Sequence, residues 1–121
     1  MLAAPLTQET TALLNRRRFA LIKRGAGLIN IGRGGLIEVA ALVDALKDET
    51  LCGAILDVYD PEPLPADSVL WHTPNTILMP HVTSDDEQKY LPKTLDLVFE
   101  NVQRLLAGQP LLNLVDRLRG Y

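Results

Sequence analysis

Three short apolar runs, at residues 27–31, 52–57 and 75–79, constrain the fold of this chain more than any other feature. Each run has the length of a strand and is apolar along most of that length. This pattern is typical of strands in a parallel sheet. The run at 52–57 in particular predicts a strand that is covered by helices on both of its faces.

Helical patterns lie between and after these runs. Helices are expected at residues 16–23, 38–47 and from about 85 to 106, with a single turn at 67–71. Asn15 is placed to cap the first helix and Gly25 to end it, while Pro92 is expected to break or restart the last one. The opening Leu2 to Ala4 resembles the tail of another strand. This alternation predicts an α/β fold in which right-handed crossovers join parallel strands.

The composition is that of an ordinary globular domain with one modest core: 121 residues, 47% hydrophobic and 22% charged. The formal net charge of -3 argues against binding to nucleic acid or to an anionic membrane, because such binding needs a basic surface. The basic run Arg16 to Arg18 is expected to be a solvated helix face. The single cysteine, Cys52, excludes an internal disulfide, and no apolar stretch has the length of a membrane span. We therefore expect a cytoplasmic protein.

Polar residues follow the apolar runs where the strands are expected to end. Arg33 follows the first run, Asp57 closes the second with Glu62 in the loop behind it, and His81 follows the third. Prolines on both sides of Glu62 stiffen its loop. Because parallel strands end at the same edge of a sheet, these side chains are expected to meet at the edge where α/β folds bind ligands.

Arg33 lies in the glycine-rich segment Asn30-Ile31-Gly32-Arg33-Gly34-Gly35. The segment does not match a dinucleotide fingerprint, because Ile37 stands where a third glycine is needed, and it lacks the Gly-Lys-Ser/Thr of a phosphate loop. The glycines allow a sharp turn in which Arg33 is the only long side chain. A guanidinium there can form two parallel hydrogen bonds with a carboxylate, so Arg33 is predicted to bind an anion. The alternative is an arginine that caps a helix or pairs on the surface.

His81 becomes a candidate acid because carboxylates are expected near it. A neighbouring carboxylate favours the imidazolium form and fixes which ring nitrogen faces a substrate. Glu62 and Asp57 are both candidates for that carboxylate. Otherwise Glu62 is a solvated loop charge and Asp57 bonds to strand-end backbone. No metal site is expected, because a strand separates His72 from His81 and the chain has only these two histidines and one cysteine.

Several of these segments together resemble the D-isomer-specific 2-hydroxyacid dehydrogenases over nearly the whole chain. The segments are Pro5-Leu6-Thr7 with Thr10, Asn30 to Gly35, Asp57-Val58-Tyr59 with Glu62 to Pro65, Leu70-Trp71 with Pro74-Asn75, and Pro80-His81. The segments together, in this order and at this spacing, are more specific for the family than any single segment. The nearest resemblance is to glyoxylate/hydroxypyruvate reductases and phosphoglycerate-dehydrogenase-like enzymes.

The resemblance implies a role for each candidate residue. Arg33 would bind the carboxylate and carbonyl of a small 2-keto acid, His81 would protonate the carbonyl oxygen as hydride arrives from the nicotinamide, and Glu62 would hold His81 protonated. Asp57 would lie by the nicotinamide carboxamide. The NAD or NADP groove would be lined by Ala4, Pro5, Ile31, Gly32, Arg33, Asp57, His81 and Thr83.

Members of that family are more than twice as long as this chain. The chain resembles the second half of their NAD(P)-binding domain, a partial Rossmann-like parallel sheet with a long carboxyl-terminal helix at 1–108, followed by a tail at 109–121 that would return to a substrate domain. We therefore expect a fragment that is inactive or feeble alone and that forms a homo-oligomer or needs the missing amino-terminal portion. The alternative is a non-catalytic half-domain for oligomerisation or protein binding.

Overall fold

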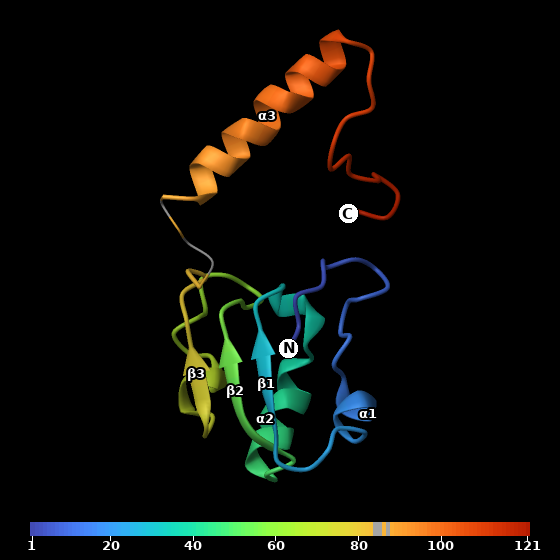
Figure 1. Ribbon diagram of the computed structural model, residues 1–121. Helices are drawn as coiled ribbons and strands as arrows, with labels where there is room; N and C mark the ends of the chain where they lie inside the picture. Colours follow the sequence, from blue (N-terminus) through green and yellow to red (C-terminus); the bar gives the residue numbers. More distant parts are fainter. Residues whose placement is uncertain (84–85, 87) are drawn as a thin grey trace. The chain divides into compact units, whose positions relative to one another are not determined.

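The computed structural model describes residues 1–83, 86 and 88–121 of the chain, in two compact units, Met1–Thr83 and Ser84–Tyr121 (Figure 1). The first unit contains strands β1 (Ala26–Asn30), β2 (Leu51–Leu56) and β3 (Thr76–Leu78), which pair in parallel in the order β1-β2-β3. The three predicted strands and their parallel arrangement are therefore confirmed, with bounds that each differ by one residue.

The amino-terminal segment pairs with β1 at one point. Leu2 forms an isolated parallel bridge with Asn30, in which the Leu2 N–H donates to the Ile29 carbonyl at 2.7 Å and the Ile31 N–H donates to the Leu2 carbonyl at 3.0 Å. The predicted strand tail is thus reduced to a single bridge. The bridge brings Ala4 close to the turn that follows β1. This closeness is seen at Gly32, where an added Cβ would lie 2.9 Å from the Ala4 carbonyl oxygen.

Helix α2 (Val39–Lys47) supplies more of the buried core than any other helix or strand. Val39, Leu42, Val43 and Leu46 form the apolar stripe that predicts this helix, and the last three are buried. They pack with Leu28, Ala54 and Leu56 of the strands. The apolar stripe of α2 therefore faces the sheet.

Within the first unit, strand β2 is covered by a helix on one face only, whereas its sequence predicts cover on both. Its buried residues are Leu51, Ala54 and Leu56, while Cys52 and Ile55 are exposed. Helix α2 contacts β2 from one face, as Figure 1 shows. On the other face Ile29, Ile55 and Ile77 lie in register and are 38%, 36% and 56% exposed. An apolar run therefore marks the strand correctly but does not reveal how many faces are covered.

Helix α1 (Arg16–Phe19) is shorter than the predicted 16–23. Its predicted cap is present, because the Asn15 side chain accepts from the Arg18 N–H at 3.2 Å. Beyond Phe19 the Leu21 and Ile22 N–H groups bond to carbonyls three residues back, so the chain tightens into turns and the helix ends. Gly25 has φ +79°, the left-handed conformation expected where the segment ends.

Two short 3₁₀ turns flank the candidate site: η1 (Gly34–Leu36) follows Arg33, and η2 (Val69–His72) precedes β3. The second is the predicted single turn, displaced by one or two residues. Ser68 caps it, since its hydroxyl accepts from the Leu70 N–H at 3.4 Å. Turn η1 lies in the connection from β1 to α2, and turn η2 lies in the connection from β2 to β3.

The second unit is built on helix α3 (Tyr90–Leu106). The predicted start near Asp85 lies outside the described residues. Pro92 is the third residue of α3 and therefore lies in its first turn. The first N–H groups of a helix have no partner within the helix, so proline costs no hydrogen bond there and does not break α3. The predicted stripe is present on α3, but its members are 44–67% exposed: Leu95, Val98, Val102 and Leu105. Among the helices of the described residues, none is long and apolar enough to cross a membrane.

Candidate active site

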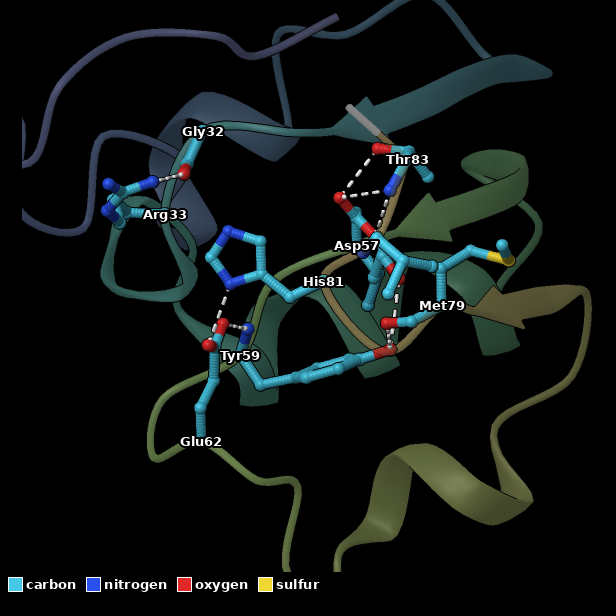
Figure 2. Close-up of polar contacts among 10 residues, drawn as sticks. Gly32, Arg33, Asp57, Tyr59, Glu62, Met79, His81 and Thr83 are labelled. Atoms are coloured by element: carbon cyan, nitrogen blue, oxygen red, sulfur yellow. Dashed lines mark hydrogen bonds and ion pairs between the residues drawn. The ribbon is translucent and has the colours of Figure 1, made fainter. Parts of the chain in front are cut away.

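His81 and Glu62 form a direct pair at the carboxyl ends of β2 and β3. The His81 Nδ1 lies 2.9 Å from the Glu62 Oε2, as Figure 2 shows. The other carboxylate oxygen, Oε1, accepts the Tyr59 backbone N–H at 2.9 Å. The side chains of His81 and Glu62 are 43% and 36% exposed, so a ligand at this edge of the sheet can reach the pair.

The pair favours a charged carboxylate. The hydrogen bond from His81, followed by that from the Tyr59 backbone N–H, lowers the pKa of the Glu62 carboxyl, although burial opposes the shift. Glu62 is therefore an anion at neutral pH, and it lies where a positive charge on the imidazole would develop. A carboxylate in this position also fixes Nδ1 as the nitrogen that faces inward and leaves Nε2 for a substrate.

Asp57 has a different role from Glu62, although the sequence offers both as partners of His81. Asp57 is 3% exposed at the end of β2. Its carboxylate accepts the Val82 N–H at 3.0 Å, the Thr83 N–H at 3.3 Å and the Thr83 hydroxyl at 2.6 Å. The imidazole therefore pairs with Glu62, whereas Asp57 binds the backbone just after His81.

The bonds to Asp57 support an unusual backbone conformation. His81 has φ +59°, in the left-handed region that residues other than glycine rarely adopt. Burial raises the pKa of Asp57, but the hydrogen bonds from the Thr83 hydroxyl and from the Val82 and Thr83 backbone outweigh it and leave a net lowering. A charged, fully bonded Asp57 thus holds the segment that aims the imidazole.

Arg33 lies at the same edge, on the turn after β1 (Figure 2). Its Nη1 donates to the Gly32 carbonyl at 2.7 Å. It occupies the N-cap position of η1 but makes no capping bond with its side chain, and it forms no salt bridge within the described part of the chain. The helix-cap alternative is therefore wrong, and the guanidinium is exposed at the mouth of the site.

Buried polar and close backbone contacts shape the turn that carries Arg33. The buried Asn30 side chain accepts the Gly32 N–H at 3.1 Å and donates to the Arg33 carbonyl at 3.0 Å. A Cβ built on Gly34 would lie 2.0 Å from the Tyr59 carbonyl carbon, so the turn packs against the backbone of the loop after β2. This close approach explains the need for glycine at position 34.

The residues predicted to line a cofactor groove lie on neighbouring segments of this edge. Ala4 and Gly32 are in close contact, Ile31 bonds to Leu2, and Thr83 is held by Asp57. Ile31 and Val82 expose apolar side chains, a surface suited to a planar ring. The acceptor positions of Asp57 are occupied by the 82–83 backbone and the Thr83 hydroxyl, so its place beside a nicotinamide stays a prediction.

The sequence interpretation missed the structural roles of Asn30 and Tyr59. Asn30 is a single amide within an apolar strand, and this signal could have pointed to its role, because a buried amide needs hydrogen-bond partners. Tyr59 carries a weaker signal: a phenol two residues after a strand end can reach strand-end carbonyls. Neither role could be assigned without the fold.

Comparisons with known proteins identify the family of this chain. The family model of the D-isomer specific 2-hydroxyacid dehydrogenase, NAD binding domain, matches residues 1–83. Glyoxylate/hydroxypyruvate reductase B of Enterobacter agglomerans is 39% identical over 95% of this chain and 35% of its own length. An uncharacterised protein of Corynebacterium melassecola is 39% identical over all of this chain and 40% of its own length.

Solved structures give the same result. A D-isomer specific 2-hydroxyacid dehydrogenase from Xanthobacter autotrophicus, in complex with NADPH and MES, matches with a TM-score of 0.88 and 42% identity over 98% of this chain and 48% of that chain. An NADPH-dependent glyoxylate/hydroxypyruvate reductase from Sinorhizobium meliloti matches with a TM-score of 0.87 and 35% identity over 98% of this chain and 38% of that one. The chain thus spans less than half the length of these relatives, and it belongs to the D-isomer specific 2-hydroxyacid dehydrogenase family.

Proposed function

We propose that this chain supplies the acid-base part of a reductase that converts a small 2-keto acid to a D-2-hydroxy acid with NADH or NADPH. The observation that carries the proposal is the Glu62–His81 pair, 2.9 Å apart and open to ligand, with the Arg33 guanidinium at the same edge. An anion site beside a charged imidazole is the chemistry that reduction of a 2-keto acid requires.

The residues of this chain would divide the reaction among them. The Arg33 guanidinium would bind the substrate carboxylate with two hydrogen bonds and so orient the carbonyl. The His81 Nε2 would donate its proton to the carbonyl oxygen, and Glu62 would stabilise the imidazolium through Nδ1. The reduced nicotinamide, when bound, would supply the hydride. Proton donation by His81 would then neutralise the negative charge that develops on oxygen.

The proposed cofactor contacts come from backbone and apolar side chains at the sheet edge. Ala4, Pro5, Ile31, Gly32 and Thr83 would hold the nicotinamide end, and the two structural relatives described above contain NADPH or NADP. We propose that residues 1–108 form the second half of the NAD(P)-binding domain and that 109–121 return to a substrate domain. The remainder of the cofactor site and the substrate lid would then come from further polypeptide.

A joined protein tests the proposal. The amino-terminal portion of the Enterobacter agglomerans reductase, fused ahead of this chain, should oxidise NADH or NADPH in the presence of glyoxylate or hydroxypyruvate. Each half alone should be at least about a hundredfold less active, since neither holds both reactants. Binding of NADPH without turnover of any small 2-keto acid would contradict the proposal.

Arg33 provides a sharper test within the joined protein. Arg33→Ala should raise KM for the keto acid about a hundredfold, because a bidentate carboxylate contact is lost. Arg17→Ala is the matched control, since Arg17 is exposed on α1 and lies in the predicted solvated run. Equal KM values for the two variants would remove Arg33 from the proposed substrate site.

A second candidate function is a non-catalytic module that associates with itself. The in-register row of Ile29, Ile55 and Ile77 favours it, because three partly exposed isoleucines side by side on a sheet are better covered than solvated. This candidate expects a stable homo-oligomer of the 121-residue chain by light scattering, and Ile55→Lys should dissociate it. A monomer at all concentrations would contradict this second candidate and leave the reductase proposal intact.

A further inference from the structure

Tyr59 bonds both to Glu62 and to the segment that leads to His81. Its backbone N–H donates to the Glu62 Oε1 at 2.9 Å, and its hydroxyl lies 2.7 Å from the Met79 carbonyl, two residues before His81. Figure 2 shows the ring extending from the Glu62 side of the pair to Met79. One residue therefore connects the loop after β2 to the segment after β3.

The hydroxyl bond lies before His81 in the chain and adds to the bonds by which Asp57 holds the backbone after it. A phenol has one proton, so the shorter contact, to Met79, is the principal hydrogen bond, and the Leu56 carbonyl at 3.0 Å is a weaker second acceptor. The Leu56 carbonyl already accepts the Met79 N–H at 2.9 Å, which is the last backbone bond between β2 and the end of β3. The hydroxyl thus extends the pairing beyond the strands, towards His81.

Tyr59 keeps this proton under ordinary conditions. Burial raises the pKa of the Tyr59 hydroxyl, the bond to Met79 opposes that effect, and the nearby Asp57 and Glu62 charges raise it further. The net upward shift means that the donor persists wherever the site would work. The Tyr59 hydroxyl is therefore protonated at neutral pH and can donate to the Met79 carbonyl.

The surroundings of the ring do not hold it in place by packing alone. A hollow of about 370 Å³ lies beside the ring and is bordered by Trp71, Leu78 and Pro63 as well as by Glu62 and His81. Space next to an aromatic ring lets it tilt unless directional bonds prevent this. The hydroxyl bonds are the directional contacts that the structure provides at the far end of the ring.

We infer that Tyr59 is a positioning residue whose hydroxyl fixes the spacing between the Glu62 carboxylate and the His81 imidazole. The consequence for catalysis rests on the proposed function, but the spacing itself does not. Removal of the hydroxyl should let the β2 loop and the His81 segment drift apart. The Glu62–His81 bond would then lengthen, although neither partner had been changed.

The direct test is Tyr59→Phe in the 121-residue chain, with the Glu62 carboxyl followed by ¹³C NMR during a pH titration. The bond from His81 is the largest cause of the low Glu62 pKa, so the midpoint should shift upward towards its ordinary value. Tyr90→Phe is the matched control, because Tyr90 is an exposed residue of α3. A Glu62 midpoint that is the same in Tyr59→Phe, Tyr90→Phe and the wild type would overturn the inference.

A measurement on the wild-type chain covers the case in which Tyr59→Phe does not fold. The Tyr59 hydroxyl proton should give its own NMR resonance, in slow exchange with water and close to the Met79 carbonyl. Fast exchange would overturn the inference. In the joined enzyme Tyr59→Phe should lower kcat about five- to tenfold, as for one lost hydrogen bond, with KM for the cofactor unchanged. An inactive joined enzyme would count against the proposed function alone, because both NMR tests are independent of turnover.

Discussion

Asp57 and Glu62 both bind the segment that carries His81, but they do so in contrasting surroundings. Asp57 is buried, and its carboxylate accepts from the Val82 and Thr83 backbone and from the Thr83 hydroxyl. Glu62 is exposed and bonds to the imidazole itself. One carboxylate therefore bonds to the backbone that presents His81, while the other bonds to the imidazole itself.

This contrast predicts that Asp57 matters mainly for stability and that Glu62 matters mainly for the proposed reaction. A buried charge with several hydrogen bonds is costly to remove, because its donors are left without partners. An exposed pair contributes little to folding, because water screens it. Changes at Asp57 should therefore appear mainly in unfolding experiments, and changes at Glu62 mainly in turnover.

The largest effect on stability is expected at Asp57. Asp57→Ala should lower the free energy of unfolding by about 3 kcal/mol, because two backbone N–H groups lose a charged acceptor and the left-handed His81 loses its support. Urea unfolding of the 121-residue chain measures this. Asp67→Ala, at an exposed carboxylate, is the control and should stay within about 0.5 kcal/mol of the wild type. A loss at Asp57 as small as that of the control would break the distinction between the two carboxylates.

The next largest effect on stability is expected in the turn that packs against the loop carrying Glu62. Gly34→Ala should cost about 2 kcal/mol, because the new methyl group would overlap the Tyr59 backbone and displace the loop that leads to Glu62. Gly27→Ala is the matched control, since its methyl group would meet only the Cys52 Sγ, at 3.9 Å. Denaturation midpoints that do not differ between the two variants would show that the loop yields freely.

Acidification should lower the stability by less than these two substitutions do. Both carboxylates have a lowered pKa in the folded chain, so the stability that they contribute is present above the ordinary values of 3.8 for Asp57 and 4.5 for Glu62 and is lost as the pH falls towards the folded values. Wild-type stability should therefore decline on acidification below about pH 4.5. Asp57→Asn should be less stable at pH 7 and lose less of its stability between pH 5 and pH 2, as followed by urea unfolding. An unchanged slope with pH would contradict a charged Asp57.

The smallest effect on stability is expected at Glu62. Glu62→Gln should change the free energy of unfolding by less than about 0.5 kcal/mol, because the pair with His81 is exposed to solvent. In the joined enzyme the same change should lower kcat about a hundredfold, since the imidazolium loses its counter-charge. A Glu62→Gln variant that loses much stability but keeps its turnover would contradict these roles of the two carboxylates.

Much of this arrangement could be predicted from the sequence. Apolar runs locate the three strands, and the rule that parallel strands end at one edge brings Arg33, Glu62 and His81 together. The periodic stripe of α2 locates the core. These predictions succeed because each depends on a local pattern or on a rule of topology.

Other features depend on contacts between distant segments and could not be predicted. The residues alone leave open whether Glu62 or Asp57 is the partner of His81, and only the family resemblance implies Glu62. In the structure the choice is set by the left-handed turn at His81 and by the bonds at Val82 and Thr83. The early end of α1 after Phe19 and the exposed isoleucine face of the sheet likewise follow from packing that sequence periodicity does not encode.

His81 is proposed as the proton donor, and the joined enzyme carrying His81→Gln tests this role. Turnover of glyoxylate or hydroxypyruvate should fall about a thousandfold, because the amide cannot donate a proton to the developing alkoxide. The dissociation constant for NADPH, measured by fluorescence titration, should stay within about twofold of the wild type, since the backbone of the site is retained. A variant that binds NADPH normally and retains turnover within about tenfold of the wild type would contradict the claim, because loss of a general acid costs more than that.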